Sequence, residues 1–275
     1  FSKYINLTNS LARYGSPDVA VPAAGSTLID HLLAHRSVRA YLPDPVNDHQ
    51  LAAIVAAAQS AASSSNLHAW SVVAVRDPAR KSRLAVLAGD QPYIRQAPLL
   101  LVWLADLARL AQVAQKVGEE HVALDYLEMF EVGVIDAALA AQNAVSAAES
   151  LGLGTVYIGA MRNRPEEVAA ELQLPPRVVA MFGLCVGTPD PAQPAAVKPR
   201  PPQSVVLHNE TYSLPAQAAG LESYDTAMSA FYASQGMKVR GTWSNHSAKR
   251  VRDAAALSGR DRLVEALHRR GFELK

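Results

Sequence analysis

A cluster of polar residues near the start of the chain has the composition of a phosphate-binding site. His35, Arg36, Ser37 and Arg39 lie within five residues of one another. Arginine offers forked donors and a permanent charge, serine a neutral donor and histidine a titratable one, so a phosphomonoester could be held by several groups at once. Taken alone, the cluster is explained more simply as the solvated basic end of a helix, where the helix dipole favours cations.

Three other segments carry groups that could bind a ligand. Lys198 and Arg200 lie among prolines that stiffen the chain, and they could contact the same phosphate or belong to a solvated linker. The run from Ser63 to Asn66 offers small hydroxyls where a helix is expected to end, although a plain loop has the same composition. Gly159 ends a predicted strand and would let another group approach the backbone, although a simple turn explains it equally well. None of these segments decides the chemistry by itself.

Several other chemistries are disfavoured by the sequence. It contains no nucleophile elbow, Walker loop, His-Glu zinc helix or Rossmann glycine triplet, which argues against hydrolases and nucleoside triphosphatases. His31 and His35 have a spacing that could bind a metal, but no carboxylate or thiolate partner accompanies them, so no metal site is expected. Cys185 is the single cysteine and lies in an apolar run, where we expect a buried hydrophobic residue and not a nucleophile.

The composition limits the partners of the chain. Its 275 residues include 26 Lys and Arg against 25 Asp and Glu, a formal charge of +1 that argues against a strongly basic nucleic-acid binder. The basic residues between 249 and 270 alternate with acidic ones and have no aromatic platform beside them. The apolar run over 97–105 is far shorter than the roughly 20 residues that span a bilayer. The start of the sequence lacks the apolar centre of a secretion signal. We therefore expect a cytoplasmic protein with no nucleic-acid or membrane partner.

The elements that must position these groups alternate between strand and helix. Apolar runs predict strands over residues 69–76, 99–105, 155–159 and 178–187. Helical spacing and capping residues predict helices over residues 26–34, 49–61, 78–87, 132–151, 165–172, 221–234 and 260–270. The helix over 132–151 is apolar on so many sides that it must be central or lie at a subunit interface. Prolines predict an extended loop over 189–202, and the class is α+β with four or five strands.

Six segments, in their order along the chain, resemble those of the flavin-dependent nitroreductases. The resemblance is to the branch that contains the NADPH-preferring oxygen-insensitive nitroreductases and flavin reductase P. The segments are HRSVRAY at 35–41, ASSSNLHAWSVVAV at 62–75, AAQNAVSAAESLGLGTVYIGAMRN at 140–163, FGLCVGTP at 182–189, KPRPP at 198–202 and TWSNH at 242–246. Their joint order favours ligand binding over the simpler explanations of the two basic clusters.

The resemblance implies a nitroreductase-like α+β fold. A central four- to five-stranded sheet would be flanked by helices, and two copies would form an intertwined homodimer that binds one FMN tightly per subunit. The fold would be a single domain over residues 26–275, with an N-terminal extension over 1–25 and a mobile excursion around 203–250. The apolar helix over 132–151 would then lie at the subunit interface.

The resemblance also implies the site. The residues that match FMN-binding positions are His35, Arg36, Ser37, Arg39, Ser63, Ser64, Ser65, Gln91, Tyr157, Ile158, Gly159, Ala160, Lys198 and Arg200. Lys198 and Arg200 would complete a phosphate clamp. Arg39 would lie near the pyrimidine edge of the flavin, where a cation stabilises the negative charge that reduction brings. Ala160 stands where close relatives often have a second glycine, a small change if only backbone faces the flavin.

Lys238 and Arg240 match the loop that binds the 2′-phosphate of NADPH in this branch. Gln235 stands where the family often has an arginine, so the preference for NADPH over NADH is left open.

The activity implied is a ping-pong, two-electron reduction of nitroaromatics, quinones or free flavins by NAD(P)H, without an obligatory protein acid or base. One alternative is a dedicated NADPH-dependent FMN reductase that supplies reduced flavin to a partner. An alternative of another class is a non-catalytic flavin-binding protein or sensor. The sequence does not name the physiological acceptor.

Overall fold

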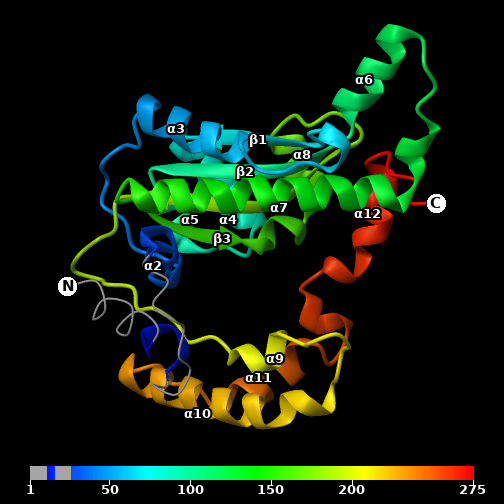
Figure 1. Ribbon diagram of the computed structural model, residues 1–275. Helices are drawn as coiled ribbons and strands as arrows, with labels where there is room; N and C mark the ends of the chain where they lie inside the picture. Colours follow the sequence, from blue (N-terminus) through cyan, green and yellow to red (C-terminus); the bar gives the residue numbers. More distant parts are fainter. Residues whose placement is uncertain (1–10, 16–25) are drawn as a thin grey trace. The chain divides into compact units, whose positions relative to one another are not determined.

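The computed structural model describes residues 11–15 and 26–275, which divide into two compact units (Figure 1). The first unit comprises the described residues of Phe1–Arg36 together with Ala195–Leu257. The second comprises Ser37–Pro194 and Ser258–Lys275. Apart from residues 11–15, the predicted extension over 1–25 lies outside the described residues, and the single domain over 26–275 stays a prediction.

The second unit is built on a four-stranded antiparallel sheet. Its strands lie in the order β1 (Trp70–Val75), β2 (Leu99–Asp106), β4 (Val178–Gly187) and β3 (Gly154–Ile158). The two central strands are buried nearly throughout, which explains why their sequences are continuous apolar runs without a polar alternation. All four predicted strands are confirmed, each end within one residue of the expected position.

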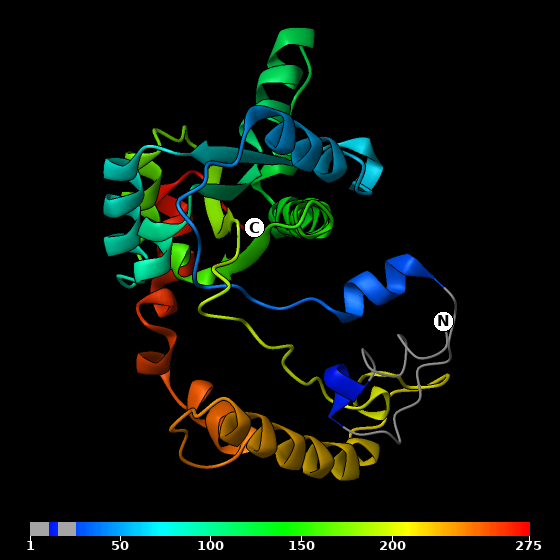
Figure 2. The same cartoon turned by 90° about the vertical axis from the view of Figure 1, so that its left-hand side faces the viewer.

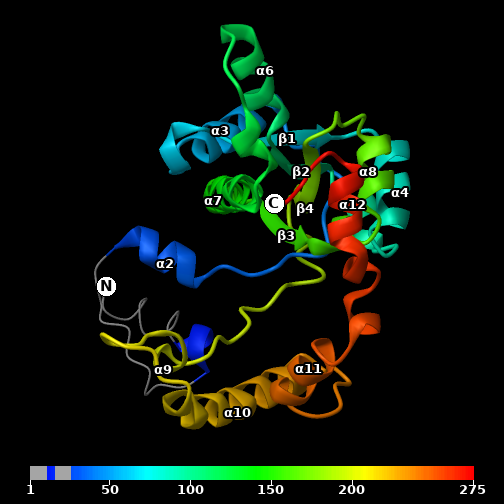
Figure 3. The same cartoon turned by 90° about the vertical axis from the view of Figure 1, so that its right-hand side faces the viewer.

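Helices cover both faces of this sheet (Figure 2). On one face, α3 (Asp48–Gln59) and the long α7 (Leu127–Ser150) pack their alanines against Leu101 and Trp103 of β2. On the other face, α4 (Pro78–Leu87), α5 (Pro92–Gln96) and α8 (Pro165–Glu171) enclose a second apolar cluster, and α12 (Leu263–Arg269) lies beside α8 (Figure 3). The sheet therefore forms the middle layer of the unit.

Four helices of the structure were not predicted, among them the short α5 and α9 (Gln203–Val206), and two predicted helices have other limits. The structure adds α6 (Ala108–Val117), which ends at Gly118 in the left-handed conformation, and α11 (Trp243–Arg250), which Thr242 and Asn245 start with a reciprocal capping box. The central helix α7 begins at Leu127, five residues before the predicted position. The helix predicted over 260–270 is a short 3-10 turn followed by α12.

The first unit is helical. Ser26 caps α2 (Thr27–Leu33) as expected, and α10 (Ala218–Ser234) packs with α9 (Gln203–Val206) and α11 (Figure 3). The rings of Tyr224 and Trp243 meet edge to face at 5.1 Å between centroids and join α10 to α11. The predicted excursion around 203–250 thus contains regular helices, and its mobility stays a prediction.

Short 3-10 helices complete the elements: η1 (Ser64–Asn66), η2 (Val122–Asp125), η3 (Gly159–Arg162), η4 (Pro215–Gln217), η5 (Ala254–Leu257) and η6 (Arg260–Arg262). Among residues 11–15 and 26–275, none of the helices combines the length and apolarity that crossing a membrane requires.

Candidate active site

The segment that carries Ser37 and Arg39 is attached to the free edge of β3. Ser37 forms a parallel bridge with Thr155, and the amide of Val38 donates a 2.8 Å hydrogen bond to the Thr155 carbonyl. A Cβ on Gly154 would lie 2.6 Å from the Val38 side chain, so only glycine allows this approach. The hydroxyl of the half-buried Tyr41 donates to the Val38 carbonyl at 2.7 Å. Burial raises the pKa of Tyr41, so its hydroxyl stays a donor.

Two of the predicted site residues are brought together by Tyr93. The Arg39 guanidinium carbon lies 6.0 Å from the centroid of the Tyr93 ring, which places the cation over the ring. The Tyr93 hydroxyl donates to Oε1 of Gln91, and Nε2 of Gln91 donates to the Ala88 carbonyl at 2.9 Å. The Gln91 amide keeps one further donor hydrogen for a ligand. Sequence reasoning missed Tyr93, and its position two residues after Gln91 was the only signal.

The end of β3 presents accessible backbone. The Tyr157 ring packs edge to face on Phe182 with 5.3 Å between centroids, and it remains 38% exposed. Ile158 is buried, while Gly159 and Ala160 begin η3. The nearest atom to a Cβ built on Gly159 would be a guanidinium nitrogen of Arg162 at 3.6 Å, which is ordinary contact. The backbone at this strand end can therefore meet a ligand directly.

The predicted serines lie in a loop that we call the serine loop, residues 63–68. It is held by Asp136 of α7, a carboxylate that is only 1% exposed. One oxygen of Asp136 accepts hydrogen bonds from Ser63 Oγ at 2.8 Å and from the Ala69 amide at 2.9 Å. The other accepts from the Ser64 amide at 3.2 Å. Asp136 is the functional residue of this region that sequence reasoning overlooked, and its signal was the one charged residue in the apolar stretch between Glu131 and Glu149.

The anchoring by Asp136 sets what the serine loop can offer to a ligand. Ser65, Asn66 and His68 have φ values of 48°, 59° and 49°, a left-handed conformation that costs free energy outside glycine. The Ser63 hydroxyl is occupied, because it also accepts a hydrogen bond from the His68 amide at 2.7 Å. The exposed hydroxyls of Ser64 and Ser65 have no hydrogen-bond partner within the described residues. These two hydroxyls are therefore the ones available to a ligand.

In the first unit, the predicted phosphate-binding cations lie on two neighbouring segments. Lys198 and Arg200 are exposed, while Pro199 between them is buried and its carbonyl accepts a 3.1 Å hydrogen bond from the Tyr224 hydroxyl. Arg36 is exposed as well, and His35 is half-buried. Hydrogen bonds from the Arg13 guanidinium reach carbonyls of both segments. The structure thus brings the 35–36 and 198–200 segments together.

Lys238 and Arg240 lie in the connection between α10 and α11. Gly236 and Gly241 flank them with φ values of 61° and 88°, which only glycine adopts freely. Both side chains are exposed and make no hydrogen bond or ion pair within the part of the chain that the structure describes. Gln235 directly follows α10 as its C-cap residue. The two cations can therefore meet a negatively charged ligand without breaking an existing contact.

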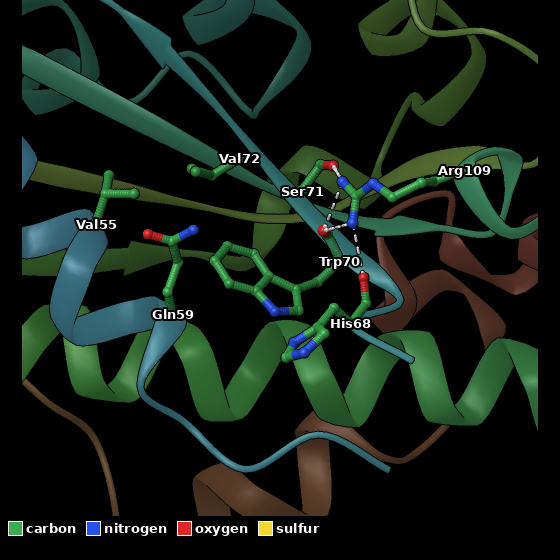
Figure 4. Close-up of a pocket in the computed structure, with 7 residues that line it drawn as sticks. All are labelled: Val55, Gln59, His68, Trp70, Ser71, Val72 and Arg109. Carbon is green, nitrogen blue, oxygen red and sulfur yellow. Dashed lines mark hydrogen bonds between the residues drawn. The ribbon is translucent and has the colours of Figure 1, made fainter. Parts of the chain in front are cut away.

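A cavity of about 430 Å³ lies against the edge strand β1, beside the serine loop (Figure 4). The Arg109 guanidinium next to it donates to the carbonyls of His68 and Trp70, at 2.8 and 3.2 Å, and to Ser71 Oγ at 2.5 Å. These bonds fix β1 to the start of α6 and leave the arginine little capacity for a ligand. The cavity contains none of the predicted site residues; its lining is Val55, Gln59, His68, Trp70, Ser71, Val72 and Arg109.

The single cysteine is buried, and the described residues contain no cluster suited to a metal ion. Cys185 is fully buried in β4, and burial raises the pKa of its thiol to about 12, as expected for a packing residue. Among the described residues, no group of three or more His, Cys, Asp or Glu side chains is placed to hold a metal ion.

Family models match nearly the whole described chain. The model of the nitroreductase family matches residues 32–188, and that of the nitroreductase family C-terminal domain matches residues 198–275. An oxygen-insensitive NADPH nitroreductase of Salmonella typhimurium is 38% identical over 248 residues, which are 90% of this chain and 98% of that protein. An FMN reductase (NADPH) of Bacillus subtilis is 40% identical over 222 residues, 79% of this chain and 88% of the relative.

Solved structures of similar proteins have the same fold. The NfrA1 nitroreductase of B. subtilis has a TM-score of 0.84 at 36% identity, covering 90% of this chain and all of that one. The NADPH:FMN oxidoreductase of Vibrio harveyi, complexed with NAD⁺, has a TM-score of 0.80 at 34% identity. The match covers 91% of this chain and all of the Vibrio harveyi chain.

Proposed function

The chain belongs to the nitroreductase family and is an NAD(P)H-dependent flavin oxidoreductase with FMN as cofactor, and we propose that it reduces nitroaromatics, quinones or free flavins by a ping-pong mechanism. In such a mechanism the oxidised nicotinamide leaves before the acceptor binds at the same place.

The donor groups of the chain fit FMN. Its phosphate needs several cations, and the first unit presents Arg36, Lys198 and Arg200 as exposed side chains on adjoining segments. Its ring needs a flat, hydrogen-bonding surface, and the second unit offers the open strand end at Gly159 and the exposed hydroxyls of the serine loop. The presence of these three exposed cations on segments that are tied together is the observation that carries the proposal.

Bound FMN supplies the redox chemistry by passing two electrons from the nicotinamide to the acceptor. The protein residues bind and orient it. We assign the phosphate to His35, Arg36, Lys198 and Arg200, and the ring and ribityl chain to Ser37, Ser64, Ser65, Gln91 and the 157–160 backbone. Ser63 contributes indirectly by fixing the serine loop to Asp136. Arg39, held over Tyr93, stabilises the negative charge that reduction places on the cofactor.

The nicotinamide nucleotide is bound in part by the connection between α10 and α11. Lys238 and Arg240 are exposed there, and two cations favour a 2′-phosphate over a hydroxyl. NADPH is therefore the preferred reductant, and NADH the poorer one because it lacks this phosphate.

We propose that the protein acts as a homodimer in the cytoplasm. Apolar side chains one helical turn apart remain exposed on two helices of the second unit: Val113 and Val117 on α6, at 53% and 67%, and Ile135 and Leu139 on α7, at 54% and 44%. Exposed apolar side chains at this spacing are typical of a protein contact, and a second copy of the chain would cover them. Light scattering on the purified protein should give twice the mass of 29.4 kDa.

Steady-state kinetics test the proposed reaction. NADPH oxidation is followed at several fixed concentrations of nitrofurazone, a quinone or FMN, and double-reciprocal plots should give parallel lines. Intersecting lines would contradict the ping-pong order, and no oxidation with any of the three acceptors would contradict the activity. Turnover with FMN far above that with nitrofurazone would instead identify a dedicated flavin reductase; one relative is named FMN reductase (NADPH).

A further inference from the structure

Arg13 is a buried cation at the meeting point of three chain segments of the first unit. Arg13 is only 6% exposed. Because arginine is almost never buried without partners, its contacts need an explanation. It lies in a helical turn over residues 11–14 and outside the residues that both family models match, which begin at residue 32. Neither the sequence motifs nor the family models assign it a role.

The guanidinium of Arg13 joins the two segments that carry the phosphate-binding cations. Nε and Nη2 both donate to the Leu33 carbonyl, at 3.1 and 2.8 Å, and Nη2 also donates to the His35 carbonyl at 2.5 Å. Nη1 donates to the Lys198 carbonyl at 3.0 Å. The three nitrogens of the planar guanidinium thus reach carbonyls on both segments, whereas a lysine would place all its donors on one atom.

The backbone of Arg13 adds a further bond to the same place. Its carbonyl accepts a 2.8 Å hydrogen bond from the Arg200 amide. Leu33 is the last residue of α2, whose end carbonyls lack partners within the helix, and the arginine supplies donors and positive charge there. The backbone on either side of Lys198 and Arg200 is therefore fixed by one residue from outside the matched domain.

We propose that Arg13 is a positioning residue for the phosphate of FMN, because it holds the 35–36 segment and the 198–200 segment at a fixed separation. The proposal rests on the proposed function, which places the phosphate between the cations of these segments. Arg13 uses its donors on carbonyls and does not itself bind the ligand. Its contribution is that Arg36, Lys198 and Arg200 are already gathered before FMN arrives, so binding does not have to order them.

The test compares FMN with riboflavin, which is the same ring and side chain without the phosphate. Flavin-free protein is titrated with each, and binding is read from the quenching of flavin fluorescence. Arg13→Ala should weaken FMN binding about tenfold or more, by analogy with the loss of groups that orient ligand-binding residues, while riboflavin binding changes little. Arg13→Lys should also weaken FMN binding more than riboflavin binding, because all of its donors lie on one nitrogen atom and match the two segments less well.

A matched control and a rescue separate positioning from folding. Arg252→Ala removes an exposed arginine of the same unit that pairs with Asp253, and it should leave both affinities unchanged. Methylguanidinium added to Arg13→Ala should restore part of the FMN affinity. If Arg13→Ala does not fold, Arg13→Lys is judged by the same ratio of FMN to riboflavin affinity.

Two results would overturn the inference in different ways. If the wild type prefers FMN to riboflavin and the Arg13 variants keep that preference, with both affinities unchanged or lowered equally, Arg13 does not position the phosphate clamp. If the wild type binds no FMN, the proposed function fails and the role of Arg13 fails with it.

Discussion

Ser63 Oγ donates a 2.8 Å hydrogen bond to the carboxylate of Asp136, which lies 73 positions further along the chain and is 1% exposed. The same carboxylate accepts two backbone amides, those of Ser64 and Ala69. Ser63 was predicted to contact the cofactor, but its hydroxyl instead anchors the serine loop, which carries Ser64 and Ser65. The left-handed residues of that loop depend on this anchor.

Removing the Asp136 carboxylate should destabilise the second unit. Asp136→Ala leaves the two amides and the Ser63 hydroxyl without acceptors in the interior, and we expect a loss of about 3 kcal/mol in the free energy of unfolding. Urea denaturation measures it. Asp48→Ala is the control, because that side chain is 89% exposed in its pair with Arg76 and should cost under about 1 kcal/mol. Equal losses in the two variants would contradict the anchoring role.

Replacing Arg39 should slow reduction of the flavin more than it weakens retention of FMN. Arg39→Ala removes the cation over Tyr93, and we expect the rate constant for reduction by NADPH to fall about 10²-fold, as for other groups that stabilise developing charge. Anaerobic stopped-flow absorbance measures the rate, and dialysis measures retention. Arg164→Ala, at an exposed pair with Glu167, serves as control. An unchanged rate of reduction in Arg39→Ala would disprove the tuning role.

The choice of reductant should depend on two cations of the first unit. Lys238→Ala with Arg240→Ala should raise the KM for NADPH roughly tenfold or more, because charge-assisted bonds to the 2′-phosphate are lost, and leave the KM for NADH nearly unchanged. Steady-state kinetics with both nucleotides give the ratio, and Arg252→Ala should leave it alone. A ratio that does not change in the double variant would show that this connection does not read the 2′-phosphate.

The thiol of Cys185 should be unreactive in the folded protein. Its pKa is raised to about 12 by burial, so the reactive thiolate is absent through the neutral range and appears only at strongly alkaline pH. We expect no reaction with Ellman's reagent at pH 8 within minutes, and one thiol per chain after denaturation in guanidinium. Rapid labelling of the native protein at pH 8 would contradict this packing.

The strands and the cation clusters could be predicted from the sequence because their signals are local. A buried strand such as Val178–Gly187 is a continuous apolar run, and the helix start at Ser26 is a capping residue. The roles of Asp136, Tyr93 and Arg13 could not be predicted, because each depends on contacts with residues that only the tertiary fold brings near. The unpredicted α6 has no proline at its start, and the carboxylate that accepts its Arg109 amide belongs to Asp106, the last residue of a buried strand.

The resemblance in sequence assigned Ser63, Ser64 and Ser65 alike to FMN binding, whereas in the structure their hydroxyls have different surroundings. Ser63 faces Asp136 and the His68 amide, while Ser64 and Ser65 are exposed. Which hydroxyl in a run of serines is available depends on the buried acceptor beneath them. No pattern within the run itself contains that information.

The most direct test of the central claim is the visible spectrum of the purified protein before and after NADPH is added under nitrogen. We predict a yellow protein whose flavin band bleaches with one equivalent of NADPH per chain, and more slowly with NADH. A colourless protein that neither retains added FMN nor oxidises NADPH would contradict the account. A yellow protein that neither nucleotide bleaches would mean that the chain holds a flavin without turning it over.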